Sequence, residues 1–137
     1  MNTTMKGRYQ GDLRCEYVHL ASGEKIITDA PTDNQGKGMA FSPTDLLCTS
    51  LAACLTTIMG ITARSKSIAF EDVHTAIEKS MGTEPRRVIG ITIIVSMSGK
   101  GLDQKSRQIL EHAALTCPVA KSLHPDIEQD IRFEYTE

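Results

Sequence analysis

The sequence predicts an α+β fold in which a sheet wraps around one buried helix. A strongly apolar segment, residues 46–61, follows a helix-start signal and is the best candidate for the central helix. A segment rich in Ile and Val, residues 87–97, is typical of a buried strand. Strand-like patterns flank the two, so that the order is strands, helix, strands, helix, strand. With 137 residues in total, we expect a single domain over residues 1–137.

The N-terminal part predicts a hairpin followed by a long loop. Residues 7–20 read as one extended segment that ends at the Ser22-Gly23 turn, and residues 24–28 read as a second short strand. Residues 29–41 are rich in Gly, Pro, Asn and Asp, and long loops in small domains often serve function. The Gly36-Lys37-Gly38 triplet lacks the Ser or Thr of a phosphate-binding loop, which favours a flexible turn.

The central helix has a well-defined start. Ser42 suits the N-cap, Pro43 the first helical position and Asp45 the third, which together resemble a capping box. The pattern continues to about Ser67. Apolar residues lie nearly all round this helix as far as Gly60, so we expect it to be buried on all sides.

The second half alternates strands and helices. Strands are expected over 68–79, 87–97 and 127–135, with a turn at 83–85, an amphipathic helix over 102–116 and a short helix restarting after Pro118.

Charge and composition exclude several classes of partner. The net charge is −2 and no run of Lys or Arg occurs, so neither nucleic acid nor an anionic membrane surface is expected. The N-terminal residues lack a signal-peptide pattern, and the segment 46–61 is short for a membrane span. We therefore expect a cytoplasmic protein without membrane contact.

Four cysteines carry the possible chemistry: Cys15, Cys48, Cys54 and Cys117. In a reducing cytosol they are core thiols, metal ligands or redox groups rather than structural disulfides. Cys54 lies in the apolar helix, where burial alone would keep it protonated and inert, so reactivity requires a positive partner. Cys117 precedes Pro118 and falls at a helix N-cap, where the dipole favours a thiolate. Without further evidence a packed core thiol is the better explanation of Cys54, and it explains Cys117 as well as a functional role does.

A pair of thiols also fits redox chemistry, because a sulfenic acid formed on one condenses with the other to a disulfide. We assign no redox role to Cys15 or Cys48. Close ligand pairs such as C-x₂-C or H-x₃-H are missing, so no metal and no cofactor are predicted. A Cys-His hydrolase stays open, because partners in space are invisible in a sequence.

Three motifs together resemble the OsmC/Ohr family of hydroperoxide reductases. They are SPTDLLCTSLAACLTTIMG over 42–60, PRRVIGITIIVSMSGKG over 85–101 and ALTCPVAKSL over 114–123. The resemblance in order and spacing extends over roughly residues 7–135. It implies antiparallel sheets wrapped around a buried central helix, in an intertwined homodimer with two active sites at the subunit interface.

The same resemblance implies the roles of individual residues. Cys54 would be the peroxidatic thiolate and Cys117 the resolving thiol, with an organic hydroperoxide, or hydrogen peroxide, as substrate. An external dithiol, such as a lipoylated protein, would act as reductant. The family's arginine is best matched by Arg14, with Arg8 as second choice, and a thiolate in an apolar helix does require a cation.

The acid that orients this arginine differs from the family pattern. Thr44 stands where the hydroperoxide-resistance branch has Glu, and Asp45 follows one residue later. Asp45 is the matching acid, although its capping role alone would explain it. This departure favours a non-catalytic stress or ligand-binding dimer as the alternative, and a thiol redox sensor is a further alternative.

Overall fold

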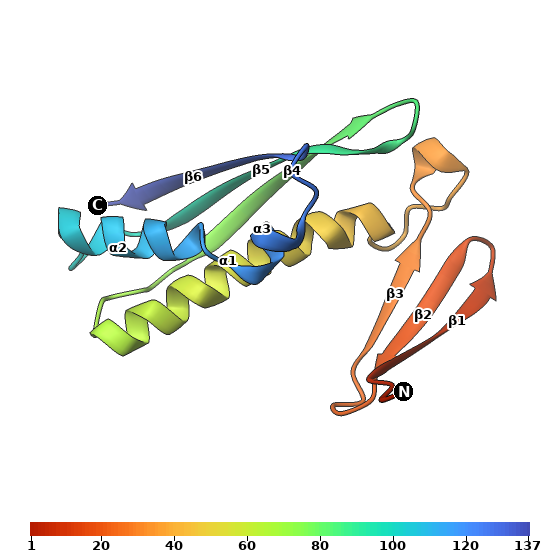
Figure 1. The fold of residues 1–137 in the computed structure, drawn as a ribbon, viewed down its shortest axis with the longest axis horizontal. Coiled ribbons are helices and arrows are strands. Elements are labelled where there is room, and N and C mark those ends of the chain that lie inside the picture. The colour runs from red at the N-terminus through yellow and green to blue at the C-terminus, as the bar shows by residue number, and fades with distance from the viewer. The chain divides into compact units, whose positions relative to one another are not determined.

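A computed structural model describes residues 1–137 and confirms the α+β class. The chain forms two compact units, residues 1–47 and 48–137, and each unit has its own three-stranded sheet (Figure 1). The strands therefore form two sheets rather than one.

The first unit contains β1 (Met5–Gly11), β2 (Arg14–His19) and β3 (Lys25–Asp29), which form an antiparallel meander. The prediction of one extended segment over 7–20 was wrong, because a tight turn divides it. Gly11, Asp12 and Leu13 have φ angles of 91°, 52° and 63°, and this left-handed backbone reverses the chain. The strand predicted over residues 24–28 is β3, and each of its ends lies one residue later than predicted.

A loop with one short 3₁₀ helix, η1 (Thr32–Asn34), connects β3 to the central helix. Gly36 packs so closely on this loop that a Cβ atom there would lie 1.7 Å from the carbonyl oxygen of Ala30. The Gly36 N–H donates to the carbonyl of Pro31 at 2.9 Å. The Gly-Lys-Gly triplet thus belongs to a tight turn, in agreement with the sequence.

The central helix, α1 (Pro43–Lys66), begins where the sequence predicts. The Ser42 Oγ accepts from the Asp45 N–H at 3.0 Å, and the Asp45 carboxylate accepts from the Ser42 N–H at 2.9 Å. This reciprocal pair is a capping box that satisfies two backbone donors at the helix start. Asp45 also places a negative charge at the positive end of the helix dipole.

The prediction that α1 is buried on all sides was wrong. One stripe is buried, formed by Cys48, Leu51, Ala52, Leu55, Met59 and Ala63. Outside the stripe, Ile61 is 58% exposed, because the chain packs against only one side of the helix. The prediction that this segment is too short to span a membrane was also wrong, because α1 has 24 residues and is long and apolar enough to cross one. A core helix of a soluble protein passes the same test, and the stripe lies in the protein core.

The second unit has the sheet β4 (His74–Gly82), β5 (Arg87–Ser98) and β6 (Glu128–Thr136). The β4–β5 pair is antiparallel, but β6 runs parallel to β5, unlike the all-antiparallel sheets that were expected. The parallel pairing follows from the connection, since two helices carry the chain back before β6 begins. β4 begins six residues later than predicted, because Ser67 and Asp72 adopt positive φ angles of 54° and 58°.

One face of β5 forms the centre of the core. Ile91, Ile93, Val95 and Met97 alternate with half-buried residues and are at most 1% exposed. They share one hydrophobic cluster with the α1 stripe and with Leu110 of α2 (Gln104–Ala114). Figure 1 shows α1 and α2 on the same side of this sheet. Full burial of each such side chain stabilises the folded state by about 1.5–3 kcal/mol.

The last two helices carry clear start signals. Asp103 caps α2 by accepting from the Ser106 N–H at 2.8 Å. α3 (Pro118–Ser122) has Cys117 at its N-cap and Pro118 at its first position, as predicted. The cap fixes the direction of the Cys117 side chain, which is the feature that matters for the candidate site.

Candidate functional site

The structure brings Cys54 and Cys117 together within the second unit. Cys54 lies on α1, half-buried, and packs against the hydrophobic core. Cys117 is fully buried at the start of α3. The two thiols lie close enough for Cys54 to raise the pKa of Cys117, and neither cysteine is in a disulfide. Two residues far apart in the sequence are thus neighbours in the core.

The surroundings of Cys117 favour the neutral thiol. Burial raises the pKa of this thiol, and the neighbouring Cys54 raises it further. The Ala120 N–H donates to the Cys117 sulfur at 3.4 Å and acts in the opposite direction. The N–H groups of the helix start do favour a thiolate, as the sequence predicts, but burial outweighs them. Cys117 is consequently a protonated thiol at neutral pH.

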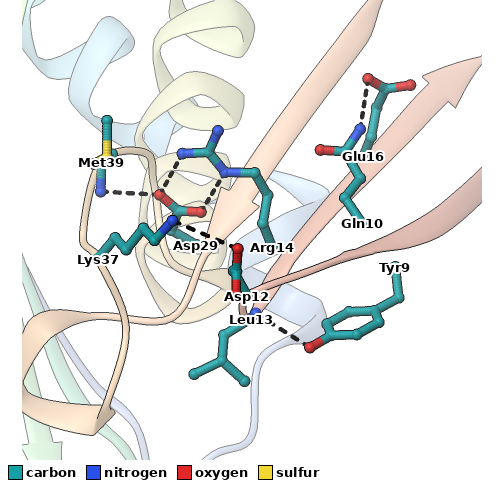
Figure 2. Close-up of polar contacts among 9 residues, drawn as sticks. All are labelled: Tyr9, Gln10, Asp12, Leu13, Arg14, Glu16, Asp29, Lys37 and Met39. Atoms are coloured by element: carbon teal, nitrogen blue, oxygen red, sulfur yellow. Dashed lines mark hydrogen bonds and ion pairs between the residues drawn. The ribbon is translucent and has the colours of Figure 1, made fainter.

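Arg14 lies in the first unit, where it forms a two-pronged ion pair with Asp29 (Figure 2). The Arg14 Nε donates to one carboxylate oxygen at 2.7 Å and Nη2 donates to the other at 2.9 Å. The two residues are directly opposite each other on β2 and β3. The Asp29 side chain is 2% exposed and that of Arg14 is 31% exposed. The pair is therefore buried on the acidic side and open on the basic side.

Asp29 also holds the loop that follows it. Its carboxylate accepts from the Met39 N–H at 3.0 Å, and its own N–H donates to the carbonyl of Phe41 at 3.1 Å. Hydrogen bonding from Arg14 lowers the pKa of Asp29, with further lowering by the Met39 N–H and by Lys37. Figure 2 shows Lys37 beside Asp29. The carboxylate thus stays ionised and ties a strand, a loop and an arginine together.

The other predicted residues take separate places. Asp45 was predicted to orient Arg14, but its carboxylate accepts from the Ser42 N–H at the start of α1. The carboxylate that forms the bidentate ion pair with Arg14 is that of Asp29. Arg8 is exposed on β1, opposite Glu16.

Sequence reasoning missed Asp29. Its signal was the cross-strand position opposite Arg14, which becomes visible only once the turn at Asp12 and Leu13 is known.

The remaining groups offer no metal centre. No group of three or more His, Cys, Asp or Glu side chains could hold a metal ion. Cys48 is 2% exposed and belongs to the α1 stripe, whereas Cys15 is half-buried on β2, opposite Thr28.

Comparison with known proteins identifies the family. A family model described as OsmC-like protein matches residues 36–132. Among solved structures, the chain is similar to a candidate osmotic stress induced and detoxification response protein from Psychrobacter arcticus 273-4. The two are 52% identical, the match covers 97% of this chain and 96% of that chain, and the TM-score is 0.92. The comparison with curated proteins gave no match.

More distant solved structures share the fold. An organic hydroperoxide resistance protein OsmC from Legionella pneumophila is 20% identical, with 96% of this chain and 97% of that chain covered and a TM-score of 0.75. An organic hydroperoxide resistance protein from Elizabethkingia anophelis is 13% identical, with 99% of each chain covered and a TM-score of 0.75. The family match, the 52% identity and the fold agree with the resemblance found in the sequence: the chain belongs to the OsmC-like protein family.

Proposed function

We propose that this protein is a thiol peroxidase that reduces organic hydroperoxides, with Cys54 as the attacking thiol and Cys117 as the resolving thiol. The observation that supports it most directly is that both cysteines belong to one core, with Cys117 buried in it and Cys54 packed against it, close enough to raise the pKa of Cys117. Family membership supports the same chemistry, since hydroperoxide resistance proteins have this fold. Hydrogen peroxide would be a second, smaller oxidant for the same site.

The reaction needs two displacements. The Cys54 thiolate attacks one peroxide oxygen, the O–O bond breaks, and the leaving alkoxide takes up a proton to become the alcohol. Cys54 is then a sulfenic acid, oxidised by two electrons. The Cys117 sulfur attacks the Cys54 sulfur, an S–S bond forms, and the sulfenic oxygen leaves as water together with the Cys117 proton. An external dithiol, of which a lipoylated protein is one example, then reduces the disulfide through thiol–disulfide exchange.

The contrast between the two cysteines fits this order of events. Cys117 is buried and protonated, so it is a poor first nucleophile but is well placed to resolve a neighbour. Cys54 is half-buried and therefore the more accessible of the pair. No cofactor is required, because thiolate attack on a peroxide supplies both electrons from sulfur.

Arg14 completes the proposal as the cation that stabilises the Cys54 thiolate, with Arg8 as second choice. A guanidinium is always charged and is weakly hydrated, which suits an apolar surrounding. Asp45 contributes through the capping box that fixes the first turn of α1. These roles come from the resemblance to the OsmC/Ohr family and are part of the proposal.

We further propose that the protein acts as a soluble cytoplasmic homodimer. Residues 1–47 bury no hydrophobic side chain, and large apolar residues such as Tyr9, Tyr17 and Ile26 are 62%, 44% and 51% exposed. A region of this size without a core of its own requires a partner surface. A second copy of the chain, as the family resemblance implies, provides it.

Turnover measurement tests the function. The purified protein is mixed with cumene hydroperoxide and a dithiol, either dithiothreitol or dihydrolipoamide, and peroxide loss is followed. We expect sustained turnover that Cys54→Ser abolishes and that Cys15→Ser, a control in a half-buried position outside the pair, retains. Oxidation without sustained turnover would instead identify a redox sensor, and unreactive thiols would leave a non-catalytic dimer.

A further inference from the structure

Arg14 and Asp29 form an arrangement that goes beyond an ordinary ion pair. A guanidinium has five N–H donors, and Asp29 takes two of them, one on Nε and one on Nη2. Three N–H groups remain, on the edge of the guanidinium that faces away from the carboxylate. No protein acceptor pairs with them, and the Arg14 side chain keeps 31% of its surface exposed. The pair therefore fixes the arginine while leaving one edge ready for an anion.

The carboxylate is fixed more firmly than the arginine. The Asp29 side chain is 2% exposed and accepts a third hydrogen bond from the Met39 N–H. Its backbone is held at the end of β3 by the pairing with Arg14 and by the hydrogen bond from its N–H to Phe41. Two-pronged Arg–carboxylate pairs constrain both distance and plane, so the guanidinium inherits the fixed position of Asp29.

A second pair in the molecule has the same bonding without the same surroundings. Arg132 donates from Nε and Nη2 to Asp130 at 3.2 Å and 2.6 Å, two residues away on β6. The side chains there are 61% and 37% exposed, so that solvent competes for both partners. This exposed pair is a matched control for the buried carboxylate of Asp29.

We propose that Asp29 is a positioning residue for the peroxidase reaction: it fixes the position and plane of the Arg14 guanidinium and with them the direction of its free edge. The inference rests on the proposed function, because it takes Arg14 as the cation that stabilises the Cys54 thiolate. It assigns to the end of β3 the orienting role that the family pattern would place at the start of the central helix. Asp45 then serves the helix cap.

Removing the Asp29 carboxylate has two opposite effects on the reactivity of Cys54. Whether the reaction rate rises or falls therefore shows which effect is larger. Asp29→Asn removes a negative charge beside the arginine, and charge alone would stabilise a nearby thiolate and speed its reactions. It also releases the guanidinium to solvent, which slows them. A positioning role predicts that the second effect is larger.

The experiment measures the alkylation rate of Cys54 by iodoacetamide at pH 7, read from the Cys54 peptide by mass spectrometry. It needs no peroxide, so it gives an answer even where turnover is missing. We expect Asp29→Asn to slow this alkylation about tenfold, as is common when a residue that orients a reactive group is lost. Arg14→Met should cause a similar loss. The control Asp130→Asn should keep the wild-type rate.

A double-mutant cycle separates positioning from general damage to the fold. If Asp29 acts through Arg14, Asp29→Asn should add nothing in the Arg14→Met background. A further loss in that background would mean a structural effect and would overturn the proposal. So would an unchanged or faster rate in Asp29→Asn while Arg14→Met is slow.

The same variants distinguish failure of the positioning role of Asp29 from failure of the proposed peroxidase function. If Arg14→Met leaves the rate unchanged, the role of Arg14 fails and the positioning role of Asp29 fails with it. Turnover in the Arg14→Met protein then decides whether the peroxidase itself stands. Where Asp29→Asn does not fold, Asp29→Glu keeps the charge and both acceptor oxygens. It should retain most of the wild-type rate, and a rate as slow as that of Arg14→Met would contradict the proposal.

Discussion

The two units of the chain are built on opposite principles. All fifteen buried hydrophobic residues lie in residues 48–137, among them Leu51, Ile93 and Leu110. The buried residues of the first unit are polar: Thr28, Asp29 and Ser42. The second unit is thus stabilised by an aliphatic core, whereas the first is held by hydrogen bonds and an ion pair and leaves large apolar side chains exposed.

The difference shows how the proposed chemistry is divided. The redox pair, Cys54 and Cys117, belongs to the part with a packed core, where side chains have fixed positions. The charged pair, Arg14 and Asp29, belongs to the part without one. Rigidity there comes from the hydrogen bonds that meet at the Asp29 carboxylate, and such networks weaken as a unit when one member is lost.

The largest expected effect on stability is in the core. Leu51→Ala should lower the free energy of unfolding by about 2–5 kcal/mol, because it removes a fully buried side chain and leaves a cavity. Urea denaturation followed by circular dichroism measures it. If Leu51→Ala lowers the free energy of unfolding by no more than a substitution of an exposed residue does, the second unit does not depend on an aliphatic core.

The loop of the first unit gives the next largest effect. Gly36→Ala should destabilise that loop by about 1–3 kcal/mol, because its Cβ would overlap the carbonyl oxygen of Ala30. Hydrogen exchange of the Met39 and Gly38 amides, compared with that of Ile93 in the core, is the measurement. Exchange should accelerate in the loop alone. Equal acceleration at Ile93 would show that the two units are not independent in stability.

A smaller effect is expected at the exposed apolar surface. Ile26→Lys should weaken self-association by about 1 kcal/mol or more if Ile26 lies in the interface. Sedimentation velocity over a range of concentrations detects the shift toward monomer. Lys25→Gln, a change at the neighbouring exposed position, is the control. A protein that is monomeric before any substitution would contradict the proposed dimer directly.

The smallest effect is a pH dependence specific to Asp29. Hydrogen bonding by Arg14 lowers the pKa of Asp29 in the folded state below its ordinary value. The resulting stabilisation is present above the unfolded-state pKa and is lost as the pH falls through the folded-state pKa. The difference in unfolding free energy between wild type and Asp29→Asn should therefore shrink in acid. A difference that stays constant from neutral to acid pH would contradict the ion pair.

Much of the fold could be predicted because its signals are local. The capping residues Ser42 and Asp45 lie three positions apart, and both form the hydrogen bonds that their spacing predicts. Cys117 and Pro118 likewise give the start of α3 from two adjacent letters. Signals of this kind require no knowledge of the rest of the chain.

Other features depend on partners distant in sequence. The turn at Asp12 and Leu13 was missed because the flanking residues read as continuous strand, and the Arg14–Asp29 pair was missed with it. The proximity of Cys54 and Cys117 came from the family resemblance, because spacing alone fits chance equally well. The exposure of Ile61 was missed because an apolar pattern does not say which of its residues the rest of the chain covers.

The most direct test of the account is the mass of the reduced protein after one equivalent of cumene hydroperoxide, followed by peptide mapping. We predict a rapid loss of about two mass units, which is the signature of one disulfide. The disulfide should map to Cys54–Cys117 and should be missing in Cys54→Ser. An unchanged mass, with both thiols slow to alkylate, would show that the two cysteines are packing residues and would contradict the peroxidase.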